Sequence, residues 1–186
     1  GTWSGENGGA VLGHAIHNHD LLVNLLGPIA HLSAMVTTRV NDIEVEDCAA
    51  ISFAMHSGAL ATSSITLGAA TDMTRIRICF DGLTAQSGTT PYAPMTDTWT
   101  FTARDPVTQS DVDAVLASID DVKSGYAGFF EALADAIEHD GTEAVTPEDG
   151  RRSIELVTAI YQAAQSGQRI NIPLEDDAPM YQGWAP

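Results

Sequence analysis

The spacing of apolar residues changes twice along this chain, and this change limits the folds that the chain can adopt. From about Gly9 to Leu26, apolar residues recur at steps of three and four, as they do on one face of a helix. Short alternating runs follow, and the helical spacing returns after Pro106. The alternating runs lie too close together for helical crossovers between them, so their sheet is predicted to be mainly antiparallel. A helix, then strands, then further helices indicates an α+β fold.

The strands are predicted from the alternation and from the turn signals between the runs. Ser57-Gly58 and Asp81-Gly82 each predict a tight turn between two strands. One face of the second strand is expected to be buried, and it carries Ala49, Ile51, Phe53 and Met55. The predicted ranges are Ile29–Val40, Val45–His56, Ala59–Leu67, Arg75–Phe80, Leu83–Gln86 and Thr98–Ala103, with an edge strand at Ile170–Leu174.

The helix ends are predicted from residues that commonly begin and end helices. Thr146 suits the N-cap of the longest helix, Pro147 its first position and Gly167 its C-terminal end. The first helix is predicted to have Asn7 as its N-cap and to end at Gly27. The later helices are predicted at Gln109–Ile119, Tyr126–His139 and Pro147–Ser166.

Composition excludes several classes of partner. The chain has 186 residues with a formal charge of −17, so nucleic acid and anionic membrane surfaces are poor partners. No apolar run approaches the roughly 20 residues that span a bilayer, and the expected location is the cytoplasm. Cys48 and Cys79 each lie in an alternating apolar run and are predicted to be buried, reduced thiols.

Three histidines within the first helix are the main candidates for chemistry. His14 and His17 fall on a polar stripe with Asp20, whereas His19 belongs to the apolar stripe. The spacing alone allows a metal site, general acid–base catalysis or a structural role. A metal site is disfavoured, because the chain has neither a His-Glu-x-x-His motif nor a set of cysteine ligands.

Two other features have a structural explanation. The Gly8-Gly9 pair lacks the further residues of a phosphate-binding loop, but it would allow close approach of a neighbouring backbone or a ligand. Glu44, Glu46 and Asp47 could suggest paired carboxylates. They stand at the start of a predicted strand, where neighbours point to opposite faces, so a turn or strand-end role is favoured.

Three stretches, in this order, resemble the C-terminal domain of the Gfo/Idh/MocA oxidoreductase family. The first is the opening helix, Gly-Gly-Ala-x-x-x-x-Ala-Ile-His-x-x-Asp-Leu-Leu, which begins at Gly8. The second is Asn41-Asp-Ile-Glu-Val-Glu-Asp47, and the third is the long helix that begins Pro147-Glu-Asp-Gly-Arg-Arg. The resemblance covers about residues 3–174.

The resemblance implies an α+β domain with a mostly antiparallel open sheet and helices packed on one face, the dihydrodipicolinate-reductase-like C-terminal domain. Residues 1–186 would then be a single substrate-binding and oligomerisation domain, with 1–7 as a remnant of an interdomain segment and 175–186 as an irregular tail. An N-terminal Rossmann domain, absent from this chain, would bind most of the NAD or NADP. The implied partners are that domain, a small-molecule substrate and further copies of the chain joined through the open sheet face.

The implied activity is hydride transfer between a nicotinamide cofactor and a sugar, polyol or related hydroxy compound, and this chain alone is expected to be inactive. His17 matches the family's catalytic histidine, but Gly13 stands where the family has an aspartate. His14 and Trp3 are the expected substrate contacts, and Asp20 is expected to orient the helix. No cofactor or metal ligand is expected in this chain. The alternative is a catalytically inactive member that acts as a ligand-binding or scaffolding protein.

Overall fold

The computed structural model describes residues 1–119, 123, 125–139, 141 and 144–185. These residues divide into two compact units, one formed by Gly1–Ala70 with Thr146–Pro186 and the other by Thr71–Val145. Helices and antiparallel sheets occur together, so the predicted α+β class is confirmed.

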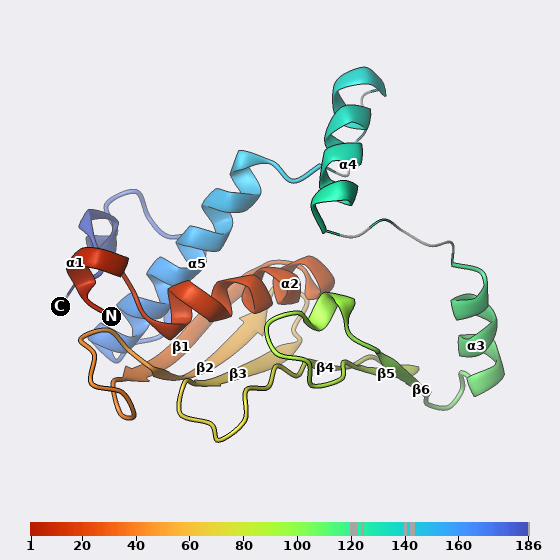
Figure 1. Ribbon diagram of the computed structural model, residues 1–186, viewed down its shortest axis with the longest axis horizontal. Coiled ribbons are helices and arrows are strands. Elements are labelled where there is room, and N and C mark those ends of the chain that lie inside the picture. The colour runs from red at the N-terminus through yellow and green to blue at the C-terminus, as the bar shows by residue number, and fades with distance from the viewer. Residues whose placement is uncertain (120–122, 124, 140, 142–143, 186) are drawn as a thin grey trace. The chain divides into compact units, whose positions relative to one another are not determined.

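The first unit contains a four-stranded antiparallel sheet in the order β3-β2-β1-β7, and Figure 1 labels its strands β1, β2 and β3. In its register Leu32 lies opposite Phe53, and Phe53 lies opposite Ala61. The predicted inner face of the second strand is confirmed, because Ala49, Ile51, Phe53 and Met55 are all buried. The strands are β1 (Ile29–Thr37), β2 (Cys48–Met55), β3 (Leu60–Thr66) and β7 (Ile170–Asn171).

Helices cover one face of this sheet. The helical elements are α1 (Trp3–Glu6), the π-helical turn η1 (Val11–Ala15), α2 (Ile16–Leu26), α5 (Pro147–Ser166) and the 3-10 turn η3 (Pro179–Gln182). α5 packs against β1 and α2 (Figure 1). Its Val157, Ala159 and Ile160 lie in one buried cluster with Leu32 and Phe53. On the opposite face, Ser33, Ser52 and Thr62 form an exposed row across three strands.

The predicted ends of the longest helix are confirmed. The Thr146 hydroxyl accepts a hydrogen bond from the Asp149 amide, and the Asp149 carboxylate accepts one from the Thr146 amide. At the other end Gly167 has a φ of 65°, the left-handed conformation that glycine adopts most easily.

The second unit contains a three-stranded antiparallel sheet in the order β4-β5-β6. In the pairing of β5 with β6, Leu83 lies opposite Ala103 and Gln86 lies opposite Thr100. α3 packs against β6, and α4 buries none of its side chains. The elements are β4 (Arg77–Cys79), β5 (Leu83–Gln86), the 3-10 turn η2 (Pro94–Thr96), β6 (Thr100–Ala103), α3 (Gln109–Ala117) and α4 (Gly125–His139).

Two predictions about individual residues are wrong. Asn7 is not the N-cap of the long N-terminal helix but the C-cap of α1, with a φ of 60°. Cys79 is exposed and Cys48 only partly buried, although both are free thiols. In the three residues of β4 the alternation turns Ile78 inward, so Cys79 faces outward with Arg77. None of the helices in the described part of the chain is long and apolar enough to cross a membrane.

Candidate active site

The start of the long N-terminal helix is bound to a residue far away in the sequence, Glu46. The Glu46 carboxylate accepts hydrogen bonds from the Gly9 amide at 3.0 Å and the Val11 amide at 2.8 Å. Its carbonyl oxygen accepts one from the Ala10 amide at 2.8 Å. Only 3% of Glu46 is exposed, so this carboxylate is a buried charge held by hydrogen-bond donors.

Tyr161 of α5 provides a further donor to the same carboxylate. Its hydroxyl group donates to Glu46 Oε1 over 2.9 Å. Burial raises the pKa of Tyr161 well above its ordinary value, and the negative charge of Glu46 raises it further. Trp3 packs edge-on against the Tyr161 ring at 5.8 Å, and Trp184 packs against the same ring at 5.3 Å. Both predicted end segments, 1–7 and 175–186, therefore place a tryptophan on Tyr161.

The glycine pair allows the close approach that the sequence suggested. A Cβ atom at Gly8 would lie 2.6 Å from the Tyr161 hydroxyl oxygen. A Cβ atom at Gly9 would collide with the Glu46 carbonyl oxygen, which belongs to backbone and cannot move aside easily. The two glycines therefore bring the chain against Glu46 and Tyr161, and a packed neighbour, not a bound phosphate, accounts for them.

Asp47, next to Glu46, stabilises a loop. Its carboxylate accepts hydrogen bonds from the amides of Arg39, Val40 and Asn41 at 2.7–2.8 Å, and its surface is fully buried. Burial acts to raise the pKa of Asp47, but the backbone donors outweigh it and hold that pKa below its ordinary value. The predicted turn or strand-end role is therefore confirmed for Asp47.

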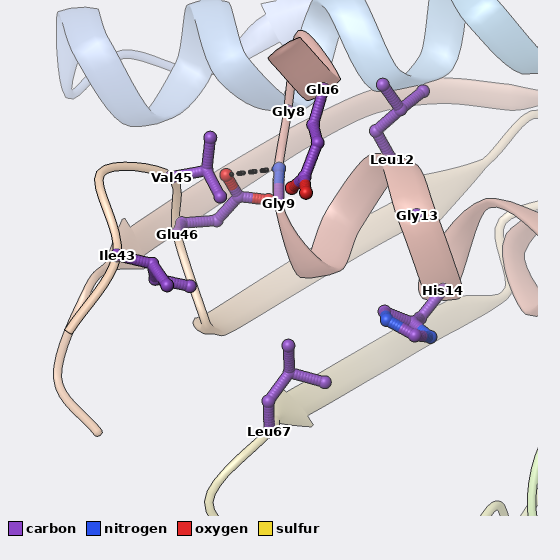
Figure 2. Close-up of a pocket in the computed structure, with 10 residues that line it drawn as sticks. All are labelled: Glu6, Gly8, Gly9, Leu12, Gly13, His14, Ile43, Val45, Glu46 and Leu67. Atoms are coloured by element: carbon purple, nitrogen blue, oxygen red, sulfur yellow. Dashed lines mark hydrogen bonds between the residues drawn. The ribbon is translucent and has the colours of Figure 1, made fainter. Parts of the chain in front are cut away.

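An open cavity of about 300 Å³ lies beside the helix start. Gly9 and Glu46 form part of its wall, and Gly13 and His14 line it from the next turn (Figure 2). Gly13 is exposed, and a Cβ atom there would meet no atom within 4 Å. The wall therefore has space for a side chain at position 13, where the family that this chain resembles carries an aspartate.

The three histidines of the helix occupy different surroundings. His14 and His17 are exposed, and His14 but not His17 lines the cavity. His19 is 2% exposed, its Nε2 lies 3.0 Å from the Ser63 hydroxyl oxygen, and its ring packs edge-on against Phe53. Burial lowers the pKa of His19 to about 4, so its ring is neutral at physiological pH. The predicted place of His19 on the core stripe is confirmed.

Asp20 connects the helix to its neighbour. The Ser153 hydroxyl of α5 donates to Asp20 Oδ1 over 2.8 Å. This contact joins two elements that are 133 positions apart in the sequence. The orienting role expected of Asp20 stays a prediction.

The surroundings of the helix start show what it can bind. The amides that commonly bind phosphate at a helix N-terminus are already bonded to Glu46, so the start of this helix does not fit the pyrophosphate of a dinucleotide. Among the described residues, no group of three or more His, Cys, Asp or Glu side chains is arranged to hold a metal ion.

The sequence pointed to the histidines but missed the partnership of Glu46 and Tyr161. The glycine pair alone predicted close packing against another segment, and it did not identify that segment. Glu46 precedes a strand and Tyr161 lies within the last long helix, 115 positions later, so no local pattern joins them.

Comparison with known proteins identifies the kind of domain. The sequence profile of a family described as "Oxidoreductase family, C-terminal alpha/beta domain" matches residues 2–172. None of the curated proteins compared matches the chain.

Solved structures give the same result. The chain is similar to the WlbA dehydrogenase from Bordetella pertussis, in complex with NADH and UDP-GlcNAcA, with 27% identity and a TM-score of 0.70. It is also similar to the WlbA dehydrogenase from Chromobacterium violaceum, with 25% identity and a TM-score of 0.71. Each comparison covers 90% of this chain and 47% of the other.

A more distant likeness extends to the aldose-aldose oxidoreductase from Caulobacter crescentus, complexed with glycerol. Its TM-score is 0.67 over 89% of this chain and 48% of that one, and at 19% identity it shows the fold alone. The chain spans about half the length of each of these structures.

Proposed function

This chain belongs to the Gfo/Idh/MocA oxidoreductase family as a C-terminal α/β domain, and from that premise we propose a function for the whole protein. It transfers hydride between a nicotinamide cofactor, NAD or NADP, and a sugar, polyol or related hydroxy compound. This chain provides the substrate-facing half, and an N-terminal Rossmann domain binds most of the cofactor. The helix start, closed to phosphate by Glu46, agrees with this division.

The observation that carries the proposal is the exposed pair His14 and His17 on a helix with a fixed start. A bound nicotinamide would take or give the hydride. His17 is the proposed general acid–base: it accepts the proton of the substrate hydroxyl in oxidation and returns it in reduction. Histidine is the side chain that most often transfers protons as a general acid or base in enzymes.

His14 and Trp3 are the proposed substrate contacts. His14 lines the cavity next to Gly13, where it takes the place of polar contacts that an aspartate at position 13 would make. Trp3 is partly buried against Tyr161 at the start of the same segment. The WlbA dehydrogenase from Bordetella pertussis, to which this chain is similar, binds UDP-GlcNAcA, a hydroxy compound, and this supports the proposed substrate class.

The open face of the β3-β2-β1-β7 sheet is the proposed interface with a second copy. Met35 and Leu60 are 73% and 82% exposed on this face, among small polar side chains. An exposed sheet face with apolar side chains and few charges suits burial against an identical copy. The proposed location is the cytoplasm.

The proposed activity is tested with the full-length protein, including its N-terminal domain. Purified protein is mixed with NAD or NADP and a panel of sugars and polyols, and cofactor reduction is followed. We expect reduction with at least one member of the panel, and none from residues 1–186 alone. Tight cofactor binding without hydride transfer to any compound would replace the proposal with its alternative, a ligand-binding or scaffolding protein. The glycine at position 13 favours that alternative.

A further inference from the structure

We propose that Glu46 is a positioning residue for the active site, because it fixes the turn that presents His14 to the cavity and supports His17 beyond it. The proposal takes its chemical meaning from the proposed function. Its geometry comes from the contacts of Glu46 alone.

Three consecutive backbone amides, those of residues 9–11, all donate to Glu46. The first amides of a helix have no partner within the helix and are usually bonded by a nearby side chain. Here Ala10 stands at the N-cap position and supplies no side-chain bond. Glu46, 35 positions away from Val11, therefore accepts the hydrogen bonds that an N-cap side chain usually accepts. Its negative charge faces the positive end of the helix dipole.

Glu46 also fixes this start to the core of the domain. Tyr161 donates to the same carboxylate oxygen as Val11, and Tyr161 is itself 3% exposed within the buried cluster. The helix start, Glu46 and α5 thus form one hydrogen-bonded unit. Because both glycines are in close contact with this unit, the start of the helix has little room to shift.

The turn fixed in this way is not an ordinary α-helical turn. Residues Val11–Ala15 form a π-helical turn, closed by a hydrogen bond from the Ile16 amide to the Val11 carbonyl oxygen. A π-helical turn changes the direction of the side chains that follow it, and such turns are frequent at functional sites. Val11, whose amide is bonded to Glu46, begins the turn, and His14 lies within it. Loss of the Glu46 contacts would therefore re-aim His14 and move His17.

The experiment uses a graded series in the full-length protein. Tyr161→Phe removes one bond to the carboxylate and leaves both amides bonded. Glu46→Gln keeps the shape of the side chain but places an NH₂ group against an amide donor, and Glu46→Ala removes every side-chain contact. Glu175→Gln is the matched control, because Glu175 is an exposed glutamate in the same unit.

The readouts are kcat, KM for each substrate and Tm, with kinetics measured at a temperature where each variant is fully folded. We expect the loss of kcat to be smallest for Tyr161→Phe and largest for Glu46→Ala. For Glu46→Gln we expect a loss of about 10- to 100-fold. The KM for the cofactor and all values for Glu175→Gln should change by less than about twofold. A merely structural role predicts a lower Tm with normal kcat, so a folded Glu46→Gln variant with kcat within twofold of the parent overturns the proposal.

A second measurement separates this proposal from the proposed function. Should the parent protein transfer no hydride, the proposed function fails, and NMR of the folded Glu46→Gln variant decides the positioning role. Faster amide exchange at Gly9 and Val11 together with a moved His14 ring signal supports it. An unchanged His14 signal overturns it.

Discussion

The helical segment that begins at Val11 has a buried start and an exposed stripe, about one turn apart. At the start, Val11 is fully buried, and the amides of residues 9–11 all have hydrogen-bond acceptors. On the stripe, His14 and His17 are exposed, and no hydrogen bond joins the His17 ring to another described residue. The start thus has its polar groups satisfied by the fold, whereas the His17 ring has no hydrogen-bond partner among the described residues.

The same contrast separates two glycines four positions apart. Gly9 is required by close packing, since any Cβ atom there would collide with backbone. Gly13 is exposed and has open space around it. Packing therefore requires glycine at position 9 but not at position 13, on the wall of the cavity.

Removal of His17 should have the largest effect on the stripe. In the full-length protein, His17→Ala is expected to lower kcat by about 10²–10⁴-fold, the range for loss of a general acid–base group. Tm should stay unchanged, because the side chain is exposed. His56→Ala, at another exposed histidine of the same unit, is the control and should leave kcat unchanged. Near-normal turnover by His17→Ala would remove His17 from the mechanism.

Replacing each of the two glycines by alanine compares the packing at the buried helix start with that at the exposed stripe. Gly9→Ala is expected to lower the free energy of unfolding by about 3 kcal/mol or more, the upper range for overpacking a tight site. Gly13→Ala should raise it by up to about 1 kcal/mol, because alanine favours a helix over glycine. Urea unfolding of residues 1–186 measures both. Equal changes in the free energy of unfolding at Gly9 and Gly13 would contradict the difference between the buried start and the exposed stripe.

His19 predicts a pH dependence of stability at the buried side of the helix. Its pKa is about 4 in the folded protein and near 6.5 in the unfolded chain. Between these values the unfolded chain takes up a proton that the folded protein does not, so stability falls as the pH drops from 6.5 towards 4. The loss should reach about 3 kcal/mol.

The variant His19→Gln keeps a group that can bond Ser63 but does not titrate in this range. The free energy of unfolding of the parent and the variant is compared at several pH values. The parent should lose more stability than the variant between pH 6.5 and pH 4. Parallel curves for the two proteins would show that His19 does not have the lowered pKa.

Removal of the Ser153 hydroxyl should have the smallest effect. Ser153→Ala deletes the hydrogen bond to Asp20, and such a bond contributes about 1 kcal/mol to stability. The free energy of unfolding should fall by about that amount, and kcat of the full-length variant should change by less than the effect of His17→Ala. A loss of activity as large as that of His17→Ala would give Asp20 a role in the reaction.

Local patterns in the sequence predicted much of the fold. Alternation predicted the buried face of β2, and Thr146 and Gly167 predicted both ends of α5, because these signals depend on neighbours in the chain. The division of the strands into two sheets was not predicted, nor was the short helix α1. Both depend on contacts between distant segments.

The candidate site was predicted only in part for the same reason. The position of His19 in the core followed from helical spacing, which is a local signal. The bonds from Glu46 to Gly9 and Tyr161 span 37 and 115 positions, and no period within the sequence encodes them. Asn7 was a reasonable N-cap by residue type, but the amides that it would have bonded are hydrogen-bonded to Glu46.

The histidines themselves offer the most direct test of the contrast between the start and the stripe. In the full-length protein, NMR signals of the ring nitrogens are followed as cofactor and then substrate are added. Substrate should shift the signals of His14 and His17, while those of buried His19 and of His56, which lies outside this helix, stay in place. Substrate that binds without moving either His14 or His17, or that moves His56 instead, would contradict the assignment of this stripe to the active site.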